Sequence, residues 1–302
     1  MGVPFSLLLP VYAGDRADYL HRAFTSTVNE QTLRPDEVVL VQDGPVSAEV
    51  AAEVRRLVAA SPVPVRLLVL PRNVGLADAL YLGLDACRYE VVARMDADDV
   101  SLPHRFERQL PVIEAGADLV GAGLLEIGDD ECVVRGRRVP PAVPDLITAS
   151  ARLHDPFNHP TVVYRRSAVH AAGGYQPLPL MEDYWLFVRM IVTGARVANL
   201  PEPLVKYRVG PALYARRGGL RLLRSELLLQ RQLRRIGFTS RVEYTRNVVV
   251  RGGYRLVPSA LRRAVYERLV ATRGERLDAS ALGVAASGPP GAPTPATTAR
   301  GV

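Results

Sequence analysis

The sequence predicts an α/β fold built on a largely parallel sheet with helices on its faces. Short apolar runs of strand length alternate with segments of helical periodicity through the first half of the chain. Such alternation is typical of right-handed β-α-β units. Several of these runs end in polar residues, and the fourth leads into Asp96, Asp98 and Asp99. Because ligands bind beyond the carboxyl ends of parallel strands, the two observations together predict a ligand site at one edge of the sheet.

Composition and charge narrow the class of protein. The 302 residues are 48% hydrophobic, which is ample for a large buried core in one or two domains. The net charge of +7 and the pI near 9.7 indicate an anionic partner, such as a nucleotide, a phospholipid surface or a nucleic acid. Charge alone does not choose among these three.

Several features favour a cytoplasmic location. Cys87 and Cys132 are far apart in the sequence and form no metal-binding or redox motif, as is typical of a reducing compartment. The N-terminal residues lack the basic region of a signal peptide. No apolar run is long enough to span a bilayer. We therefore expect a cytoplasmic protein that is soluble or peripheral on the inner face of the cell membrane.

The first half of the chain contains four expected strands, each an apolar run closed by turn residues. Helices are expected between them because apolar residues recur there at helical spacing. A later helix is expected to begin near Ser101, capped by Asp99 or Ser101. The strands cover residues 5–9, 37–41, 65–70 and 91–93, and the helices cover residues 15–28 with Asp15 as cap, residues 48–60, residues 76–87 and residues 107–115.

The second half is predicted to continue the α/β pattern less regularly. Basic residues interrupt an apolar pattern after residue 125, which is typical of an edge strand or hairpin. The expected elements are a strand at residues 117–125, the edge strand with Arg135, Arg137 and Arg138, a helix opened by Asp145, a strand at residues 162–164, and an amphipathic helix from Glu182.

The aspartate cluster admits two interpretations. Carboxylates repel one another and resist burial, so three of them directly after a buried strand indicate a bound cation. Hard oxygen ligands favour Mg²⁺ or Mn²⁺, held together with substrate phosphates. Aspartates after strands also serve as turn residues or helix caps, and the spacing alone does not decide. An EF-hand calcium loop is not expected, because Val100 and Ser101 occupy its fifth and sixth positions.

Other carboxyl-end loops would join the cluster at the same edge of the sheet. Asp43 could accept a hydrogen bond from a base or ribose, Arg72 could meet a phosphate, and Asp98 could hold a metal. The chain has neither a Walker motif nor a G-x-G-x-x-G motif. A P-loop ATPase or a dinucleotide-dependent dehydrogenase is therefore not expected.

Motifs at the strand ends form a set. They are Pro10, Val11 and Tyr12 after the first strand, Asp43 with Gly44 after the second, Asn73 opening an Asn-x-Gly element, and Asp96, Ala97 and Asp98 after the fourth. This set resembles the nucleotide-sugar-binding half of the family 2 glycosyltransferases, whose fourth strand carries an Asp-x-Asp motif. The resemblance implies the GT-A fold. It also implies that Asp98 is the metal ligand and that the other motif residues, with Arg72, contact the nucleotide sugar.

The resemblance extends to Glu182 and Asp183 in the second half. In these transferases an Asp following Glu at this position is the usual general base, which implies that role for Asp183. The reaction itself needs a carboxylate to take the proton of the acceptor hydroxyl. Without the upstream motifs, the same acidic pair would be interpreted as an ordinary helix N-cap.

Four further residues are candidate contacts to the acceptor or to phosphate: His159, Glu182, Trp185 and Arg208. A lone His before Pro is more often structural than a ligand, so His159 is included only as a candidate. Many related transferases have a His shortly after a Tyr-Arg pair, whereas this chain has Tyr207, Arg208, Val209 and Gly210. That departure puts a second protein ligand for the metal in doubt. Arg208 could compensate phosphate charge or be a solvated surface residue.

The chain is expected to divide into a catalytic domain and a C-terminal extension. The catalytic domain covers residues 1–210, with a nucleotide-sugar half at about residues 1–125 and an acceptor half at about residues 126–210. Residues 211–276 combine Leu and Val with Arg, which suits either a membrane-surface helix or an Arg-coated helix packed on the catalytic domain or on a partner subunit. Residues 277–302 are rich in Ala, Gly, Pro, Ser and Thr and predict a disordered tail.

The resemblance is to bacterial family 2 enzymes of the capsule and exopolysaccharide type. It implies an inverting transfer that depends on Mn²⁺ or Mg²⁺, from a nucleoside-diphosphate sugar, most often a UDP-sugar, to a growing glycan or a polyprenyl-diphosphate-linked acceptor. The alternatives are a non-catalytic nucleotide-sugar or glycan-binding module of the same fold and a sugar-phosphate nucleotidyltransferase. The nucleotidyltransferase is less favoured because its Gly-rich N-terminal signature is not visible. A nucleic acid partner would explain the charge but not the aspartates, so none is expected.

Overall fold

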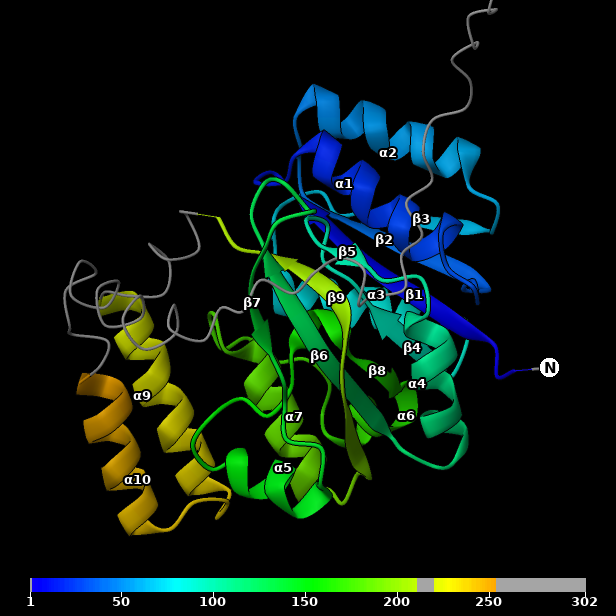
Figure 1. Cartoon of the computed structure of the whole chain (residues 1–302). Helices are drawn as coiled ribbons and strands as arrows, with labels where there is room; N and C mark the ends of the chain where they lie inside the picture. Colours follow the sequence, from blue (N-terminus) through cyan, green and yellow to red (C-terminus); the bar gives the residue numbers. More distant parts are fainter. Residues whose placement is uncertain (1, 211–219, 254–302) are drawn as a thin grey trace, which may run out of the picture.

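A computed structural model describes residues 2–210 and 220–253 of the chain (Figure 1). Nine strands form one continuous sheet with the order β3-β2-β1-β4-β8-β6-β9-β5, and β7 pairs with β6 outside this path. The strands are β1 (Phe5–Tyr12), β2 (Glu37–Asp43), β3 (Val65–Val69), β4 (Val91–Arg94), β5 (Val100–Ser101), β6 (Leu119–Ile127), β7 (Val134–Arg138), β8 (Val163–Arg165) and β9 (Val197–Arg208).

The first four strands of this order are parallel, as the alternating pattern predicts. β1 pairs in parallel with both β2 and β4, and β2 with β3. The direction then changes, because β8 is antiparallel to β4 and to β6, while β6 and β9 are parallel to each other. The largely parallel sheet that the sequence predicts is therefore present in the first half of the chain, and the antiparallel pairs of β8 join it to strands of the second half.

Helices cover both faces of the sheet because the buried strands are apolar on both sides. Leu7 of β1 packs with Leu20 and Phe106 on one face, and the neighbouring Leu8 packs with Leu80 on the other. The first face carries α1 (Ala17–Phe24), α2 (Ala48–Ala60) and α4 (Arg105–Glu114), and the second carries α3 (Leu76–Ala86), α6 (Arg166–Ala171) and α7 (Glu182–Val192).

Two short elements and a C-terminal group complete the described chain. α5 (Pro144–Ser150) and the 3-10 turn η2 (His159–Thr161) lie between β7 and β8 in sequence, and a π-helical turn η1 (Thr25–Asn29) continues α1. The C-terminal group comprises α9 (Leu220–Arg235), α10 (Arg241–Asn247) and η3 (Val248–Gly252) and lies beside α7 in the view of Figure 1.

The apolar face of α9 is packed against the catalytic domain. Leu222, Leu229 and Leu233 share a buried cluster with Tyr184 and Val188 of α7. Arg251 of η3 binds the fully buried carboxylate of Glu226 in α9, with Nη2 2.9 Å from Oε2, and its Nη1 donates to the carbonyl of Leu153 at 2.6 Å, which connects both elements to the segment after α5. α9 therefore packs on α7, as one interpretation of this basic segment predicts, and membrane contact by its exposed side stays a prediction.

Two sequence-based expectations were wrong in detail. No helix begins at Ser101, because Val100 and Ser101 form β5 against Lys206 and Val205 of β9, and α4 starts at Arg105 without a side-chain cap. Asp15 does not cap α1, because its carboxylate accepts from the backbone N–H of Tyr12 at 2.8 Å.

The sequence pattern did not predict β9, a strand of twelve residues. Pro201 and Pro203 interrupt its apolar pattern, and the ladder with β6 shifts register around Gly123 to accommodate them.

None of the helices in the described ranges is both long and apolar enough to cross a membrane. The predicted disordered tail at residues 277–302 lies outside the described residues.

Candidate active site

The aspartate cluster lies in the loop that follows β4. Asp96, Asp98 and Asp99 each offer a carboxylate oxygen, and these oxygens lie within 4.8 Å of one another. Met95 at the start of the loop donates its N–H to the carbonyl of Leu8 in β1, which fixes where the strand ends. The sequence-predicted convergence of carboxylates is therefore present, at the carboxyl end of a central parallel strand.

The surroundings of Asp98 and Asp99 disfavour the ionised form of each carboxyl group. Burial, followed by the neighbouring charge of Asp96, raises the pKa of Asp98 to about 6. Burial, followed by repulsion from Asp98 and Asp96, raises the pKa of Asp99 well above its usual range. Oδ1 of Asp99 accepts from the N–H of Arg208 at 2.8 Å, whereas Oδ2 is buried and finds no hydrogen-bond partner among the described residues. An unpartnered buried carboxylate oxygen beside two other carboxylates fits a divalent cation.

Arg94 is the residue that the sequence analysis missed. It is the last residue of β4, its side chain is 1% exposed, and its guanidinium binds the carboxylate of Asp96 with two nitrogens, one of them 2.7 Å from Oδ2. Burial raises the pKa values of Asp98 and Asp183, and the positive charge of Arg94 opposes both rises. Arg94 therefore acts electrostatically on both the aspartate cluster and Asp183. Its position inside an apolar run, immediately before the acidic loop, was the signal that could have identified it.

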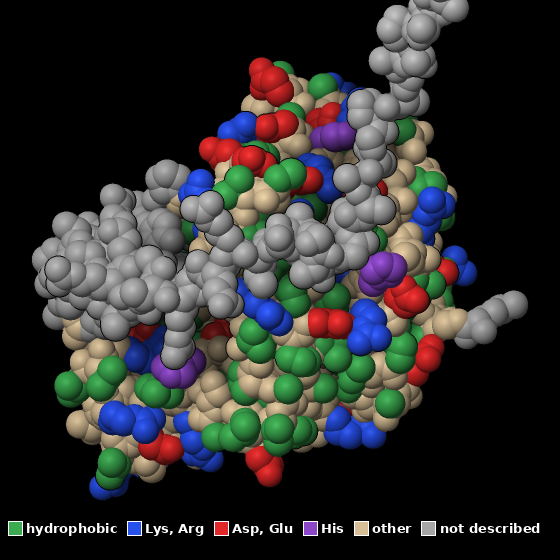
Figure 2. All heavy atoms as spheres, viewed as in Figure 1, with side chains coloured by type: hydrophobic (Ala, Val, Ile, Leu, Met, Phe, Trp, Pro, Cys, Tyr) green, Lys and Arg blue, Asp and Glu red, His purple; other side chains and the backbone are tan. Residues whose placement is uncertain are grey.

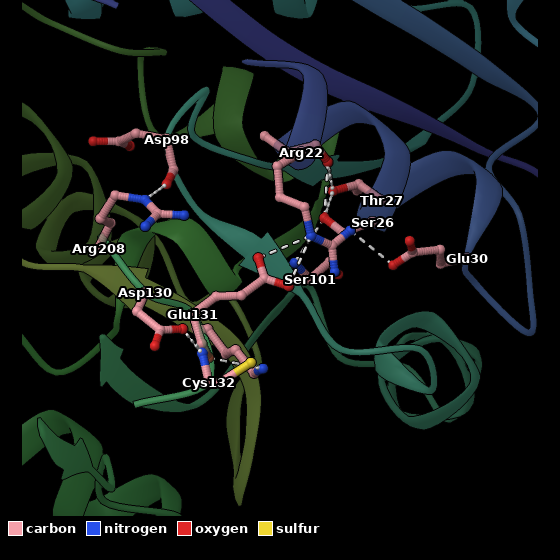
Figure 3. A network of polar contacts seen from close by, with 12 residues as sticks. Arg22, Ser26, Thr27, Glu30, Asp98, Ser101, Asp130, Glu131, Cys132 and Arg208 are labelled. Atoms are coloured by element: carbon pink, nitrogen blue, oxygen red, sulfur yellow. Dashed lines mark hydrogen bonds and ion pairs between the residues drawn. The ribbon is translucent and has the colours of Figure 1, made fainter. Parts of the chain in front are cut away.

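Arg208 locks the aspartate loop to the end of β9 (Figure 3). Its Nε donates to the carbonyl of Asp98 at 2.9 Å, and its Nη1 donates to the carbonyls of Gly128 and Asp129 at 2.6 and 2.8 Å. The guanidinium also stacks on the ring of Tyr19, 4.0 Å from its centroid. These contacts fix the position of the aspartate loop relative to β9 and residues 128–129. The predicted contact of Arg208 with phosphate stays a prediction.

Asp43 shapes the neighbouring loop. Its carboxylate accepts from the backbone N–H groups of Val74 at 2.7 Å and Gly75 at 3.0 Å and from the side-chain amide of Asn73 at 3.0 Å. Gly44 follows with φ of 82°, and a Cβ there would collide with the backbone of Asn73. The predicted nucleotide-sugar residues Asp43 and Asn73 are thus in contact with each other, and each supports the loop.

The remaining predicted donor residues lie at the same strand ends. Pro10 and Val11 are buried in β1, while Tyr12 is 40% exposed and stands opposite Asp43 in the β1–β2 register. Arg72 is exposed beside the loop that Asp43 holds. Ala97 is buried between the aspartates, with 5% exposure.

The second group of acids lies at the start of α7. Oδ1 of Asp183 accepts from the N–H of Tyr184 at 2.7 Å, and Oδ2 lies 3.6 Å from Nδ1 of His159. Burial raises the pKa of Asp183, while the Tyr184 N–H and Arg94 oppose the shift. Burial and the charge of Asp183 raise the pKa of Glu182 to about 7. Such shifts are typical of acids and bases at active sites.

Two further residues lie near Asp183: Trp185, a candidate contact from the sequence, and Asp155. Trp185 is 7% exposed, and its indole N–H donates to Gln176 at 3.0 Å, so most of its ring is committed to the core. Asp155, which the sequence analysis missed, follows α5; burial and the charge of Asp183 raise its pKa well above the usual range. No motif marks Asp155 in the sequence, because its proximity to Asp183 arises only from the fold.

Comparisons with known proteins agree with this geometry. A family model described as "Glycosyl transferase family 2" matches residues 6–171. The amylovoran biosynthesis glycosyltransferase AmsE of Erwinia amylovora is 38% identical over 266 residues, which cover 87% of this chain and 98% of that protein.

Two further proteins are similar over most of their length. The UDP-Gal:alpha-D-GlcNAc-diphosphoundecaprenol beta-1,3-galactosyltransferase of Escherichia coli is 29% identical over 275 residues, covering 88% of this chain and 96% of that protein. The structure of the mannosyltransferase PcManGT from Pyrobaculum calidifontis in complex with GDP-Man and Mn²⁺ superposes with a TM-score of 0.61 at 18% identity, covering 93% of this chain and 79% of that chain. The chain therefore belongs to glycosyltransferase family 2, has the GT-A fold, and is a glycosyltransferase of polysaccharide biosynthesis.

Proposed function

We propose that the protein transfers a sugar, with inversion, from a UDP-sugar to a glycan or a polyprenyl-diphosphate-linked acceptor. The observation that carries the proposal is that Arg94 binds Asp96 of the aspartate cluster and also stabilises the negative charge of Asp183. The aspartate cluster suits a metal and a diphosphate, and Asp183 suits a base. The donor named for the Escherichia coli relative is UDP-Gal, and its acceptor is linked to diphosphoundecaprenol. Both support the chemical classes proposed here.

The donor is proposed to bind over the ends of β1, β2 and β4. Tyr12 offers an exposed ring beside Asp43, and the loop held by Asp43 presents Arg72 toward solvent. In this proposal Pro10, Val11, Asn73, Asp96 and Ala97 shape the pocket for the nucleoside. Phosphates would lie toward Asp98.

A divalent cation fits the carboxylates of this site. Asp98 would hold it, with the unpartnered oxygen of Asp99 nearby and Asp96 kept in place by Arg94. When bound, Mn²⁺ or Mg²⁺ would neutralise charge that develops on the leaving diphosphate.

The proposed reaction is a single displacement. The acceptor oxygen forms a bond to the anomeric carbon while the bond from that carbon to the diphosphate oxygen breaks. Asp183 takes the proton of the acceptor hydroxyl, which requires its ionised form. Attack opposite to the leaving group inverts the configuration at the anomeric carbon.

The acceptor side is proposed to face a membrane. In this division residues 1–210 catalyse the transfer, and residues 211–276 place the domain on the inner face of the cell membrane. The exposed side of α10 and η3 carries Val242, Val249 and Val250 together with Arg241 and Arg246. Figure 2 shows apolar and basic side chains interspersed in this part of the molecule, at the lower left. Mixed apolar and basic faces bind anionic lipid surfaces.

A binding experiment tests the proposed donor site. A panel of nucleotide sugars is titrated by calorimetry with and without Mn²⁺, using the wild type, Asp98→Asn and the exposed control Asp145→Asn. We expect one donor to bind in a metal-dependent manner, with loss of binding only in Asp98→Asn. If Asp98→Asn bound the donor as tightly as the wild type, or if Mn²⁺ did not change the donor affinity of the wild type, the metal role of Asp98 would be contradicted.

A turnover experiment tests the proposed base. Asp183→Asn is expected to retain donor binding while the release of nucleoside diphosphate falls by about a hundredfold or more. Donor binding by the wild type without any turnover, with acceptor extract present, would instead support a non-catalytic binding module.

A further inference from the structure

The proposed base contacts a histidine that is almost entirely buried. His159 opens η2, is 7% exposed, and places Nδ1 3.6 Å from Oδ2 of Asp183. The backbone around it is fixed to β6, because the side-chain amide of Asn158 donates to the carbonyl of Ala122 and the hydroxyl of Thr161 accepts from the N–H of Ala122. The imidazole therefore has little freedom to turn away from Asp183.

The other ring nitrogen faces two buried tyrosines. Nε2 of His159 lies 3.0 Å from the hydroxyl of Tyr175, which lies 3.5 Å from the hydroxyl of Tyr164. Tyr175 is 4% exposed and Tyr164 is fully buried. The ring of Phe187 packs edge-on against the imidazole at 5.8 Å. Both nitrogens are thus occupied by protein groups, which leaves His159 little opportunity to contact an acceptor directly.

The environment decides which nitrogen carries the proton. Burial and the charge of Arg94 lower the pKa of His159 well below its usual range, so the ring is neutral at neutral pH. A neutral imidazole has one N–H group and one lone pair. With the proton on Nε2, the lone pair of Nδ1 would point at a carboxylate oxygen. With the proton on Nδ1, the N–H points at that oxygen and Nε2 accepts from the hydroxyl of Tyr175. For this, the hydroxyl of Tyr175 turns its hydrogen from the oxygen of Tyr164, 3.5 Å away, to Nε2, which is nearer at 3.0 Å.

We propose that His159 is a positioning residue for Asp183, held neutral as the Nδ1–H tautomer so that it fixes the orientation of the carboxylate. The role rests on the proposed function of Asp183 as base. The N–H of Tyr184 donates to Oδ1 at 2.7 Å, and the imidazole N–H faces Oδ2 from 3.6 Å, which is longer than a hydrogen bond. The attraction between this N–H and Oδ2 is therefore a weaker second restraint on the plane of the carboxylate. Because Nδ1 already carries a hydrogen, His159 cannot receive the proton that Asp183 takes from the acceptor. The proton stays on Asp183 until it is released to solvent.

Fixed charges around Asp183 set the background for this effect. Arg94 faces it from the end of β4, Asp96 from the following loop, Glu182 from α7 and Asp155 from the segment after α5. Arg94 stabilises the ionised carboxylate, and the three acids oppose it. All four remain in a His159 variant, so a change in that variant reports on the imidazole.

The tautomer can be observed directly. The full-length protein is labelled with ¹⁵N-histidine, and long-range ¹H–¹⁵N correlation spectra are recorded at neutral pH. The chain contains five histidines, so the signals of His159 are assigned by their loss in His159→Asn. We expect a neutral ring protonated at Nδ1 in the wild type, and a shift toward the Nε2–H form in Asp183→Ala. A wild-type ring protonated at Nε2, or at both nitrogens, would overturn the proposal.

Kinetics separate positioning from a purely structural role. His159→Asn keeps an N–H donor near the place of Nδ1, whereas His159→Leu keeps bulk without a donor. With water as acceptor and the donor selected from the panel, we expect His159→Leu to lower kcat by about tenfold or more with little change in donor KM. In His159→Leu the acidic limb of the pH profile of kcat should move to higher pH, because the ionised carboxylate of Asp183 loses the nearby N–H group. His159→Asn should recover much of the lost kcat.

The outcomes distinguish the proposal from the function on which it rests. Equal loss in both folded variants, with donor KM raised in each, would reject the positioning role. If the wild type turns over no donor, the proposed function fails, while the spectra still decide the tautomer.

Discussion

Arg94 shows how one side chain can set the chemistry of a whole site. A guanidinium that is almost fully buried keeps Asp96 in place and opposes the rise that burial causes in the pKa values of Asp98 and Asp183. The sequence predicted the carboxylates because several acids after an apolar strand are unusual. It did not predict the guanidinium between them, because an Arg at the end of a strand is usually exposed and only the fold shows that both faces around it are covered.

Asp98 provides a stability prediction at the same scale. Its folded-state pKa of about 6 lies above the ordinary value of 3.8, so the folded protein binds the extra proton more tightly than the unfolded chain does. The stabilisation from this group is therefore full at low pH and is lost as the pH rises through about 6. In metal-free buffer at pH 8, Asp98→Asn should raise the free energy of unfolding by about 1 to 2 kcal/mol, less than the full shift implies because Asp98 is not fully buried.

Denaturant titrations at pH 5 and pH 8 check this expectation. The gain should be smaller at pH 5, where the wild-type carboxyl is largely protonated, and Mn²⁺ should stabilise only the wild type. Asp145→Asn, on an exposed helix, is the control and should change little. If Asp98→Asn were less stable than the wild type at pH 8, the ionised carboxylate of Asp98 would not destabilise the metal-free protein.

At the scale of elements, the loops were predicted better than the strand that joins them. The Asp43 turn and the aspartate loop follow from local signals, because acids and glycine after apolar runs mark where a strand ends. β9 and β5 could not be predicted in the same way. β9 contains two prolines, and β5 is two residues long and exists only because β9 lies beside it. The partners of Arg208 and the proximity of Asp155 to Asp183 depend on the same long-range pairing.

The Asp43–Gly44 turn offers a prediction for an element. Gly44 has φ of 82°, and a Cβ would collide with the N atom of Asn73. Gly44→Ala should therefore displace the loop at residues 72–75, lower stability by about 1 to 3 kcal/mol, and raise donor KM more than it lowers kcat. Thermal unfolding and donor kinetics measure the two effects. Gly253→Ala is the control, since no atom of the described residues lies within 4 Å of the added Cβ. Equal effects in both variants would contradict the turn's role.

At the scale of the molecule, the C-terminal helices are part of the catalytic body as far as the structure describes them. Leu222, Leu229 and Leu233 of α9 pack on α7, which carries the proposed base, and the exposed side of the C-terminal helices combines Arg with apolar residues. The amphipathic pattern correctly predicted two faces. It could not say which surface the apolar face would cover, because a membrane and a neighbouring helix both accept Leu side chains.

The outer face provides the prediction at this scale. Val242 and Val249 are 79% and 67% exposed and lie on the same side of α10 and η3. Replacing both with Ser should weaken co-sedimentation with vesicles containing anionic lipid while leaving the fold unchanged, because neither side chain packs in the core. Val133→Ser with Val139→Ser, two exposed positions that flank β7, forms the control pair. Unchanged sedimentation of the Val242 and Val249 variant would place any lipid contact elsewhere.

The position of β9 has a consequence for how the protein is made. A chain synthesised from its N-terminus exposes β1 to β4 long before residues 197–208 leave the ribosome, so the Asp43 turn can close early. The aspartate loop cannot be locked in the same period, because Arg208 supplies the N–H for Asp99 and the donor for the Asp98 carbonyl. A nascent chain stalled before residue 208 should therefore have a formed Asp43 turn, while the aspartate loop lacks its hydrogen bonds to Arg208. Once Arg208 has been added and β9 can pair, these hydrogen bonds can form and the site is complete.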